Sequence, residues 1–212
     1  MSAGPPVIRI VDDDEAFRTA ISRVVRAAGF QVREFASAGD YLLSQSEEEH
    51  GCLLLDLRMP GPSGLDLQRA LSRKENSVPI VFLTAHGDIS ASVRAMKGGA
   101  TDFLVKPVKR ETLLSAIRTA LAKDEEQRGA RGELAELRSR YETLSSRERD
   151  VLRLVVAGKL NKQIAAAIGA SERTVKAHRA RVMQKMRATS VADLVRAADR
   201  LGAAAEVASP PI

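Results

Sequence analysis

CLLLDLRMPG, residues 52–61, is the stretch that decides the fold of this 212-residue chain. An aspartate, Asp56, ends an apolar run that has the length and composition of a buried strand. A buried carboxylate is costly unless it is neutralised, paired or placed beside a cation. The stretch therefore predicts a strand with a functional carboxylate at its carboxyl end.

Four other short apolar runs have the same strand-like pattern, and helical patterns separate the five runs. The predicted strands are residues 7–11, 32–35, 53–56, 79–84 and 103–106. The predicted helices are residues 14–28, 38–46, 65–73, 90–97 and 109–123. Such alternation is typical of a doubly wound α/β fold, in which helices cover both faces of a parallel sheet. Ligands of these folds bind at the carboxyl ends of the strands.

Acidic residues stand at two of these strand ends. Asp12 and Asp13 directly follow the first strand, and Asp56 ends the third. In a sheet of order 2-1-3-4-5 these strands are neighbours, so the three carboxylates converge. Like charges at that separation repel and require a cation, and an open site of oxygen ligands suits Mg²⁺. Asp14 is interpreted as the cap of the first helix.

Two further strand ends carry Thr84 and Lys106. Together with the carboxylates they describe a phosphoryl-accepting aspartate, because a carboxylate can attack phosphorus and form an acyl phosphate. A metal would neutralise the developing charge. Lys106 would pair with one phosphoryl oxygen, and Thr84 would donate a hydrogen bond to another. Each residue alone is ordinary at a strand end, and the combination is specific.

The charge of the chain is unevenly distributed. The formal net charge is +6 and the sequence pI is near 9.8. Residues 143–212 hold 13 basic and 6 acidic residues and account for the excess. Cys52 is the only cysteine, which suits a reducing cytoplasm. Residues 1–6 do not resemble a signal peptide, and no apolar stretch approaches the length of a membrane span, so we expect a cytoplasmic protein without a membrane partner.

The last third of the chain has the pattern of four helices. The longest, from Ser171 to about Arg187, is expected to turn Val175, Val182 and Met186 toward a core. Its opposite face lacks the glutamates that an ordinary solvated helix mixes with its cations. The small side chains Ala177 and Ala180 on that face would let the helix approach base edges, and the flanking cations would reach phosphates. The candidate DNA-binding residues are Arg173, Lys176, Ala177, Arg179, Ala180, Arg181 and Lys185.

These patterns resemble a known family in both parts of the chain. Val11-Asp12-Asp13, DLRMPGPSG, Thr84-Ala85 and Lys106-Pro107 are similar to the motifs of response-regulator receiver domains, over residues 6–123. LSSRERDVL, NKQIA and RTVKAHR resemble the LuxR-type helix-turn-helix, over residues 143–205. Residues 124–142 are expected to be a linker, helical in its second half. The whole chain looks like a NarL/FixJ-type response regulator, closest to the FixJ-like subgroup.

For the acidic site, the resemblance implies that Asp56 accepts phosphate from a sensor histidine kinase. It implies that Asp12, Asp13, Asp56 and the backbone carbonyl of Arg58 ligate Mg²⁺, with Asp12 acting partly through water. It also implies that Phe103 rotates inward when Thr84 turns toward the phosphoryl group; by residue type alone, Phe103 could equally be a core aromatic.

For the basic domain, the resemblance implies binding to double-stranded promoter DNA, with Lys176, Ala177 and Ala180 at base-facing positions. Ala180 stands where some relatives carry a polar side chain, so an apolar contact is expected there. Phosphorylation is expected to promote a homodimer through the fourth helix, fifth strand and fifth helix of the receiver. The last helix, with Val191, Leu194 and Val195, would pair on DNA, and RNA polymerase is an expected partner.

Two alternatives remain open at this point. One is a Mg²⁺-dependent phosphatase or phosphotransferase of the haloacid-dehalogenase type. Such enzymes need a second aspartate two residues after the nucleophile, where this chain has Arg58. The other is a DNA-binding protein that is independent of phosphorylation. We expect a non-enzyme with at most slow autodephosphorylation.

Overall fold

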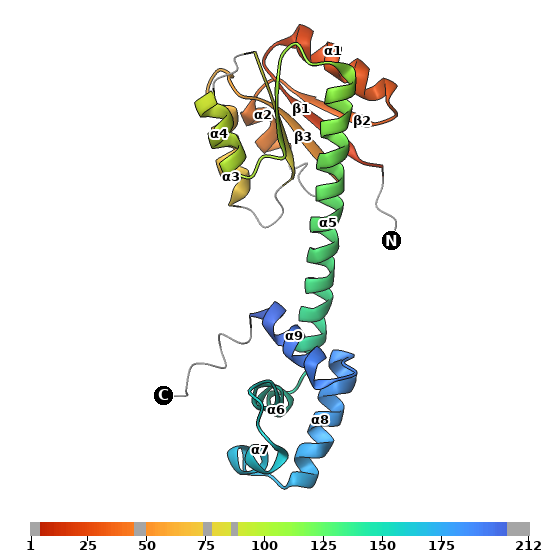
Figure 1. Ribbon diagram of the computed structural model, residues 1–212, viewed down its shortest axis with the longest axis vertical. Helices are drawn as coiled ribbons and strands as arrows, with labels where there is room; N and C mark the ends of the chain where they lie inside the picture. The colour runs from red at the N-terminus through yellow and green to blue at the C-terminus, as the bar shows by residue number, and fades with distance from the viewer. Residues whose placement is uncertain (1–4, 45–49, 74–77, 86–88, 203–212) are drawn as a thin grey trace. The chain divides into compact units, whose positions relative to one another are not determined.

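The computed structural model describes residues 5–44, 50–73, 78–85 and 89–202 (Figure 1). The chain forms two compact units that divide between Arg128 and Gly129. The first unit alternates strands and helices, and the second is helical. This is the predicted combination of an α/β receiver fold with an all-α domain.

The first unit contains a five-stranded parallel sheet in the predicted order, β2-β1-β3-β4-β5. Its strands are β1 (Val7–Val11), β2 (Gln31–Phe35), β3 (Gly51–Asp56), β4 (Ile80–Thr84) and β5 (Asp102–Val105). Every residue of β1, β3 and β4 is buried. These strands are almost continuously apolar because helices cover the sheet on both faces.

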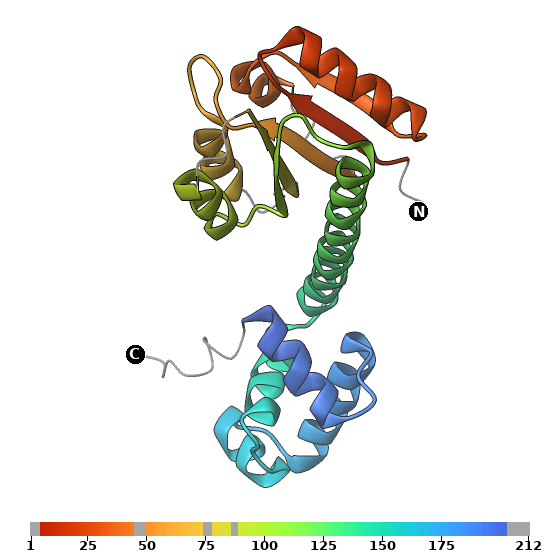
Figure 2. The same cartoon turned by 45° about the horizontal axis from the view of Figure 1, so that its top comes forward.

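The helices of this unit are α1 (Glu15–Ala27), α2 (Ala38–Leu43), α3 (Gly64–Ser72), α4 (Ile89–Lys97) and the first part of α5 (Arg110–Glu142). Helices α1 and α5 cover one face of the sheet, and α2, α3 and α4 cover the other (Figures 1 and 2). The predicted helix at 38–46 ends at Leu43, and residues 45 and 46 lie outside the described part of the chain.

The register of the strands brings their carboxyl ends to one edge. Val11 of β1 lies opposite Leu55 of β3, so the next residues along the two strands, Asp12 and Asp56, lie side by side at the edge of the sheet. Thr84 lies opposite Val105, and Lys106 follows directly. The backbone N–H of Lys106 donates to the carbonyl of Thr84 at 2.7 Å, which extends the pairing to the end of the strand.

Two short-range features fix the loops at this edge. Asp14 caps α1 as predicted, because its Oδ1 accepts the backbone N–H of Phe17 at 3.0 Å. Gly64 begins α3 where a Cβ atom would lie 2.2 Å from the backbone oxygen of Asp56. Only glycine allows that close approach, so Gly64 holds the loop after Asp56 tightly against the end of β3.

Helix α5 differs from the sequence prediction. It runs without interruption from Arg110 to Glu142, so residues 124–142 are helical throughout and not only in their second half. Gly129 and Gly132 each cost roughly 1 kcal/mol in a helix relative to alanine. The strong helix formers around them, with packing of the helix on both sides of the glycines, outweigh that cost.

The junction between the units, after Arg128, lies inside the predicted linker of residues 124–142, but the start of that linker is packed against the first unit. Asp124, the first residue of the predicted linker, is buried in the first unit. Its Oδ2 accepts the backbone N–H of Gly51 at 2.9 Å and lies 2.6 Å from Nδ1 of His50. These contacts hold α5 against the start of β3. A local sequence pattern does not predict them, because Asp124 is far in sequence from His50 and Gly51.

The second unit packs the end of α5 with α6 (Ser146–Val156), α7 (Asn161–Ile168), α8 (Glu172–Met186) and α9 (Val191–Leu201). Leu137 is buried in its core and Tyr141 packs against that core, so the end of α5 belongs to this unit. Ser145 and Glu148 form a capping box at the start of α6. Leu160 is the N-cap residue of α7, and Asn161 is its first helical residue.

Candidate functional site

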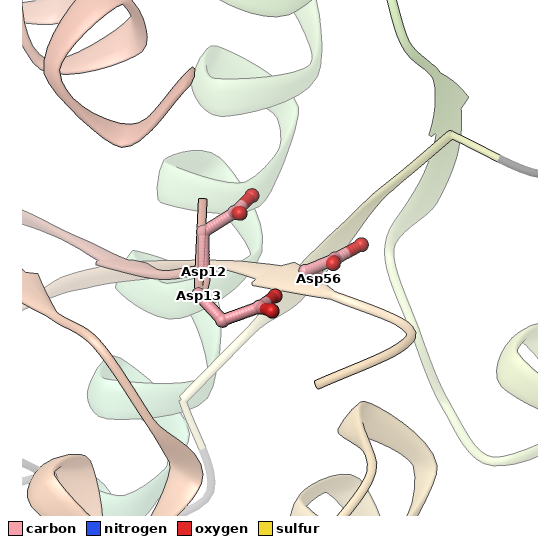
Figure 3. Close-up of side chains that lie close together, drawn as sticks. All are labelled: Asp12, Asp13 and Asp56. Atoms are coloured by element: carbon pink, nitrogen blue, oxygen red, sulfur yellow. The ribbon is translucent and has the colours of Figure 1, made fainter. Parts of the chain in front are cut away.

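Three carboxylates converge at the carboxyl edge of the sheet. Ligand oxygens of Asp12, Asp13 and Asp56 all lie within 4.8 Å of one another (Figure 3). Asp12 and Asp56 are buried, with 1% and 7% of their surface exposed, whereas Asp13 is exposed. The cluster is therefore closed on the side of the sheet and open to solvent through Asp13.

Burial and charge both act on Asp56. Loss of solvent raises the pKa of its carboxyl above the usual value, the Lys106 ammonium opposes that rise, and the neighbouring charge of Asp12 adds to it. The carboxylate keeps one hydrogen bond, from the backbone N–H of Leu57 to Oδ1 at 2.8 Å. A bound cation would relieve this crowding of negative charge.

Lys106 supplies the positive charge of the site. Its Nζ donates to Oδ2 of Asp12 at 2.6 Å and lies 3.6 Å from Oδ1 of Asp56. Only 12% of the Lys106 side chain is exposed, so this ammonium is largely removed from water. The ion pair thus forms mainly with Asp12, while Asp56 lies within reach.

The donor set fits Mg²⁺ by its chemistry. Carboxylate oxygens are the ligands that this ion takes from proteins, and it retains several waters, for which the exposed side at Asp13 leaves room. Arg58 follows Asp56 by two residues, and its side chain is exposed. The role of its backbone carbonyl as a metal ligand stays a prediction.

Thr84 and Phe103 occupy the neighbouring strands. Thr84 is 1% exposed at the end of β4. Phe103 on β5 is half-buried, packs against the core beneath α3 and α4, and has its ring centroid 6.2 Å from that of Phe82. Phe103 therefore contributes to packing, and its predicted rotation stays a prediction.

Two residues of this site were not predicted from the sequence, and both lie on the first turn of α1. The ring of Phe17 lies under the Lys106 ammonium, with 4.0 Å from Nζ to the ring centroid. Nη1 of Arg18 donates to the backbone carbonyl of Asp12 at 2.6 Å. The capping pattern at Asp14 placed these residues near the strand end, but it did not show which way they point.

Helix α8 has the predicted polarity. Val175, Val182 and Met186 are buried in the core of the second unit. The opposite surface is exposed and carries Arg173, Lys176, Ala177, Ala180, Arg181, Gln184 and Arg187. Exposed cations around two alanines on one helix surface form a candidate nucleic-acid interface.

Two of the predicted DNA-binding cations have partners inside the unit. Nη1 of Arg179 donates to Oδ1 of Asn161 at 2.7 Å. Nζ of Lys185 donates to Oε2 of the buried Glu148 at 2.6 Å and to the carbonyl of Thr143 at 2.9 Å. Both residues tie α8 to its neighbours, and their predicted DNA contacts stay untested.

The predicted pairing surface of the last helix needs a correction. Leu194 is 2% exposed and belongs to the core of the second unit. Val191 is exposed and Val195 is half-buried. Because Leu194 belongs to the core, it cannot contact a partner without unpacking the domain. The resemblance implied a pairing role for the last helix but did not distinguish the core side of α9 from its exposed side.

The chain matches two family models. Residues 8–118 match the response regulator receiver domain, and residues 142–198 match the luxR family of bacterial regulatory proteins. Among the described residues, no helix is long and apolar enough to cross a membrane.

Characterised relatives span almost the whole chain. Nodulation protein W of Bradyrhizobium diazoefficiens is 46% identical over 94% of this chain and 88% of its own length. Response regulator protein TodT of Pseudomonas putida is 47% identical over 95% of this chain and 88% of its own length. Transcriptional regulatory protein FixJ of Azorhizobium caulinodans is 39% identical over 96% of this chain and 97% of its own length.

Solved structures of response regulators are also similar to this chain over nearly its whole length. Response regulator StyR is 44% identical, covers 93% of this chain and 100% of its own, and has a TM-score of 0.80. Full-length FixJ from B. japonicum is 36% identical, covers 95% of this chain and 99% of its own, and has a TM-score of 0.57.

Proposed function

The chain belongs to the two-component response regulators that join a receiver domain to a LuxR-type DNA-binding domain, and we propose that its input is phosphorylation of Asp56. Its function as a transcriptional regulator of this family follows from the two domains and the relatives. The residue-level chemistry, the metal and the assembly are the proposal.

One observation carries the assignment of Asp56. Its carboxylate ends β3 within 4.8 Å of two other carboxylates and 3.6 Å from the Lys106 ammonium. In the proposed reaction an Asp56 oxygen bonds to phosphorus while the bond from phosphorus to the phosphohistidine nitrogen of a sensor kinase breaks. The imidazole leaves, and an acyl phosphate remains on Asp56.

The surrounding residues would stabilise the product. Asp12, Asp13, Asp56 and the backbone carbonyl of Arg58 would hold Mg²⁺, with Asp12 partly through water. When bound, that ion supplies charge neutralisation for the carboxylates and the phosphoryl oxygens. Lys106 would pair with one phosphoryl oxygen, Thr84 would donate a hydrogen bond to another, and Phe103 would follow Thr84 inward.

The output would be DNA binding through α8. Lys176, Ala177 and Ala180 would face base edges, and Arg173 and Arg181 would contact phosphates. Exposed apolar side chains on α4 and β5 support a homodimer through the α4, β5 and α5 surface of the receiver: Ile89, Val93, Met96 and Val105. RNA polymerase is proposed as a partner at the promoter, and the cytoplasm as the compartment.

We propose no turnover of an external substrate, only slow loss of the protein's own phosphoryl group. The position two residues after Asp56, which a haloacid-dehalogenase-type enzyme would fill with an acid, holds the exposed Arg58. A cation there cannot protonate a leaving group in the way that a carboxylic acid does.

Substitution of the phosphoacceptor tests the proposal. Asp56→Asn should abolish labelling by acetyl phosphate with Mg²⁺, because an amide does not attack phosphorus. Intact-mass spectrometry measures the added phosphoryl group. Asp66→Asn removes an exposed carboxylate from α3 and should label like the wild type. Undiminished labelling of Asp56→Asn would overturn the assignment.

A further inference from the structure

The ammonium of Lys106 has an aromatic partner as well as an acidic one. Its Nζ lies 2.6 Å from Oδ2 of Asp12 on one side and 4.0 Å from the ring centroid of Phe17 on another. At that distance the negative face of the ring attracts the cation, and the attraction is greater where water is excluded. With the Lys106 side chain only 12% exposed, the ring takes a place that water would otherwise occupy.

Three contacts hold the Phe17 ring in this position. Oδ1 of Asp14 accepts the backbone N–H of Phe17 at 3.0 Å, which fixes the first turn of α1. Nη1 of the next residue, Arg18, donates to the backbone carbonyl of Asp12 at 2.6 Å, which ties that turn to the acidic loop. The ring itself packs against the core cluster beneath α1 and α5. The site is therefore braced from the helix as well as from the sheet.

We propose that Phe17 is a positioning residue for Lys106, and the inference rests on the proposed role of Asp56. Lys106 must exchange its pairing with Asp12 for a phosphoryl oxygen on Asp56, 3.6 Å away before the reaction. A ring face attracts a cation without accepting a directed hydrogen bond. Phe17 thus holds the ammonium between the two carboxylates and leaves its N–H groups free to change acceptor.

Other side chains at this position would act differently. An aliphatic residue would fill the space but would leave that side of a desolvated ammonium without an attractive partner. A carboxylate would compete with the phosphoryl group for the same N–H donors. Asp14 also contributes indirectly, because its cap on the first turn of α1 fixes the position of Phe17 relative to Lys106.

Simple core packing is the competing explanation for Phe17, and the chain offers a matched control. Phe30 is also partly buried and packs against the same core cluster. If Phe17 only fills space, Phe17→Leu and Phe30→Leu should affect the site equally.

The first experiment measures the rate of phosphorylation by acetyl phosphate at saturating Mg²⁺. We expect Phe17→Leu to be about tenfold slower, the effect of a cation–π contact of ordinary strength. Phe30→Leu and Phe17→Tyr should remain within about twofold of the wild type. Equal rates for Phe17→Leu and the wild type would overturn the positioning role.

The second experiment keeps the shape of the ring. Phenylalanines with one, two or three fluorines, incorporated at position 17 alone, withdraw charge from the ring face and hardly change its volume. The logarithm of the rate should fall steadily with the number of fluorines. A flat series would mean that only packing matters, and this series decides the question even if Phe17→Leu folds poorly.

A third measurement does not depend on phosphorylation. In the metal-free protein, ring current from Phe17 should shift the NMR signals of the Lys106 ε-methylene protons upfield, and Phe17→Leu should abolish that shift. If the wild type itself is not labelled on Asp56, the phosphoacceptor assignment fails and the positioning role falls with it. Normal labelling together with an absent ring-current shift overturns the positioning role alone.

Discussion

At the scale of single residues, the main feature of the site is the Asp56 carboxylate, whose ionised form is destabilised by its surroundings in the folded protein. Asp56 carries a carboxylate with a raised pKa, because it is removed from water and faces two other acids. A group of this kind lowers stability where it is ionised. The folded protein tolerates that cost because the same crowding creates affinity for a cation and a reactive oxygen.

Asp56→Asn should therefore stabilise the metal-free protein at neutral pH, by about 1 kcal/mol, a typical effect of a single substitution. The folded pKa lies above the unfolded one, so the favourable contribution of Asp56 exists at low pH and is lost as the pH rises through the folded pKa. The difference in free energy of unfolding between Asp56→Asn and the wild type should become smaller as the pH is lowered. Urea denaturation at several pH values, in the presence of a chelator, measures it.

Mg²⁺ should make the wild type more stable than Asp56→Asn, the reverse of the order expected without metal. At 100 times its dissociation constant the ion adds about 2.7 kcal/mol to the stability of a protein that binds it only when folded. The wild type should gain that amount, and Asp56→Asn should gain less. An equal gain in both proteins would contradict a metal site that includes Asp56.

At the scale of secondary-structure elements, a half-buried ion pair joins two helices of the second unit. Glu148 caps α6 and accepts from Lys185 of α8 at 2.6 Å, with only 4% of the glutamate exposed. The hydrogen bond from Lys185, followed by that from the backbone of Ser145, lowers the pKa of the Glu148 carboxyl. The pair thus joins the first helix of the DNA-binding domain to its candidate recognition helix.

Glu148→Gln should lower the free energy of unfolding of the second unit by about 2 kcal/mol at pH 7, because a charged hydrogen bond is lost. The stabilisation by Glu148 is present above its unfolded pKa and is lost as the pH falls through the lowered folded pKa. The effect of the substitution should thus vanish in acid. Thermal denaturation by circular dichroism tests this, with the exposed Glu172→Gln as a control that should stay close to the wild type.

The ion pair between Lys185 and Glu148 distinguishes Lys185 from Arg181, although both were predicted from the sequence to bind DNA. Arg181 is exposed, whereas Lys185 is engaged by Glu148 and Thr143. Arg181→Ala should weaken DNA binding at all sequences and reduce the salt dependence, the slope of log K against log salt, by about 1. Lys185→Ala should chiefly lower the melting temperature.

Fluorescence anisotropy with labelled promoter DNA at several salt concentrations measures the slope. Arg153→Ala, which removes one positive charge from α6, is the matched control and should leave the slope unchanged. A slope unaffected by Arg181→Ala would remove Arg181 from the set of phosphate contacts.

At the scale of the whole molecule, phosphorylation is proposed to promote dimerisation of the receiver. Val105 on β5 and Met96 on α4 are half exposed, 51% and 46%, although both are apolar. Met96→Asp should raise the dissociation constant of the phosphorylated dimer at least tenfold, since about 1.4 kcal/mol suffices for that change and a buried charge costs more. Sedimentation velocity with acetyl phosphate and Mg²⁺ measures it.

The control places the same charge on a different apolar residue. Leu43 on α2 is 83% exposed, and Leu43→Asp should dimerise like the wild type. If both variants dissociate equally, the dimer does not use the α4 surface and the effect is one of net charge.

The amino-acid sequence by itself determined the parallel sheet, the strands that form it and the residues at its carboxyl edge. That was possible because strand runs and helix caps are local patterns, and because a parallel sheet necessarily brings successive strand ends to one side. Asp12, Asp13, Asp56, Thr84 and Lys106 could be assigned to one edge for this reason alone.

Only the tertiary structure decided which side chains meet. The contact of Phe17 with Lys106, the pairing of Lys185 with Glu148, and the burial of Leu194 join elements that are distant along the chain. Each depends on how one helix is rotated against its neighbours. Packing of the complete core sets that rotation, and a local sequence pattern can indicate which side of a helix is buried but not which partner each side chain meets.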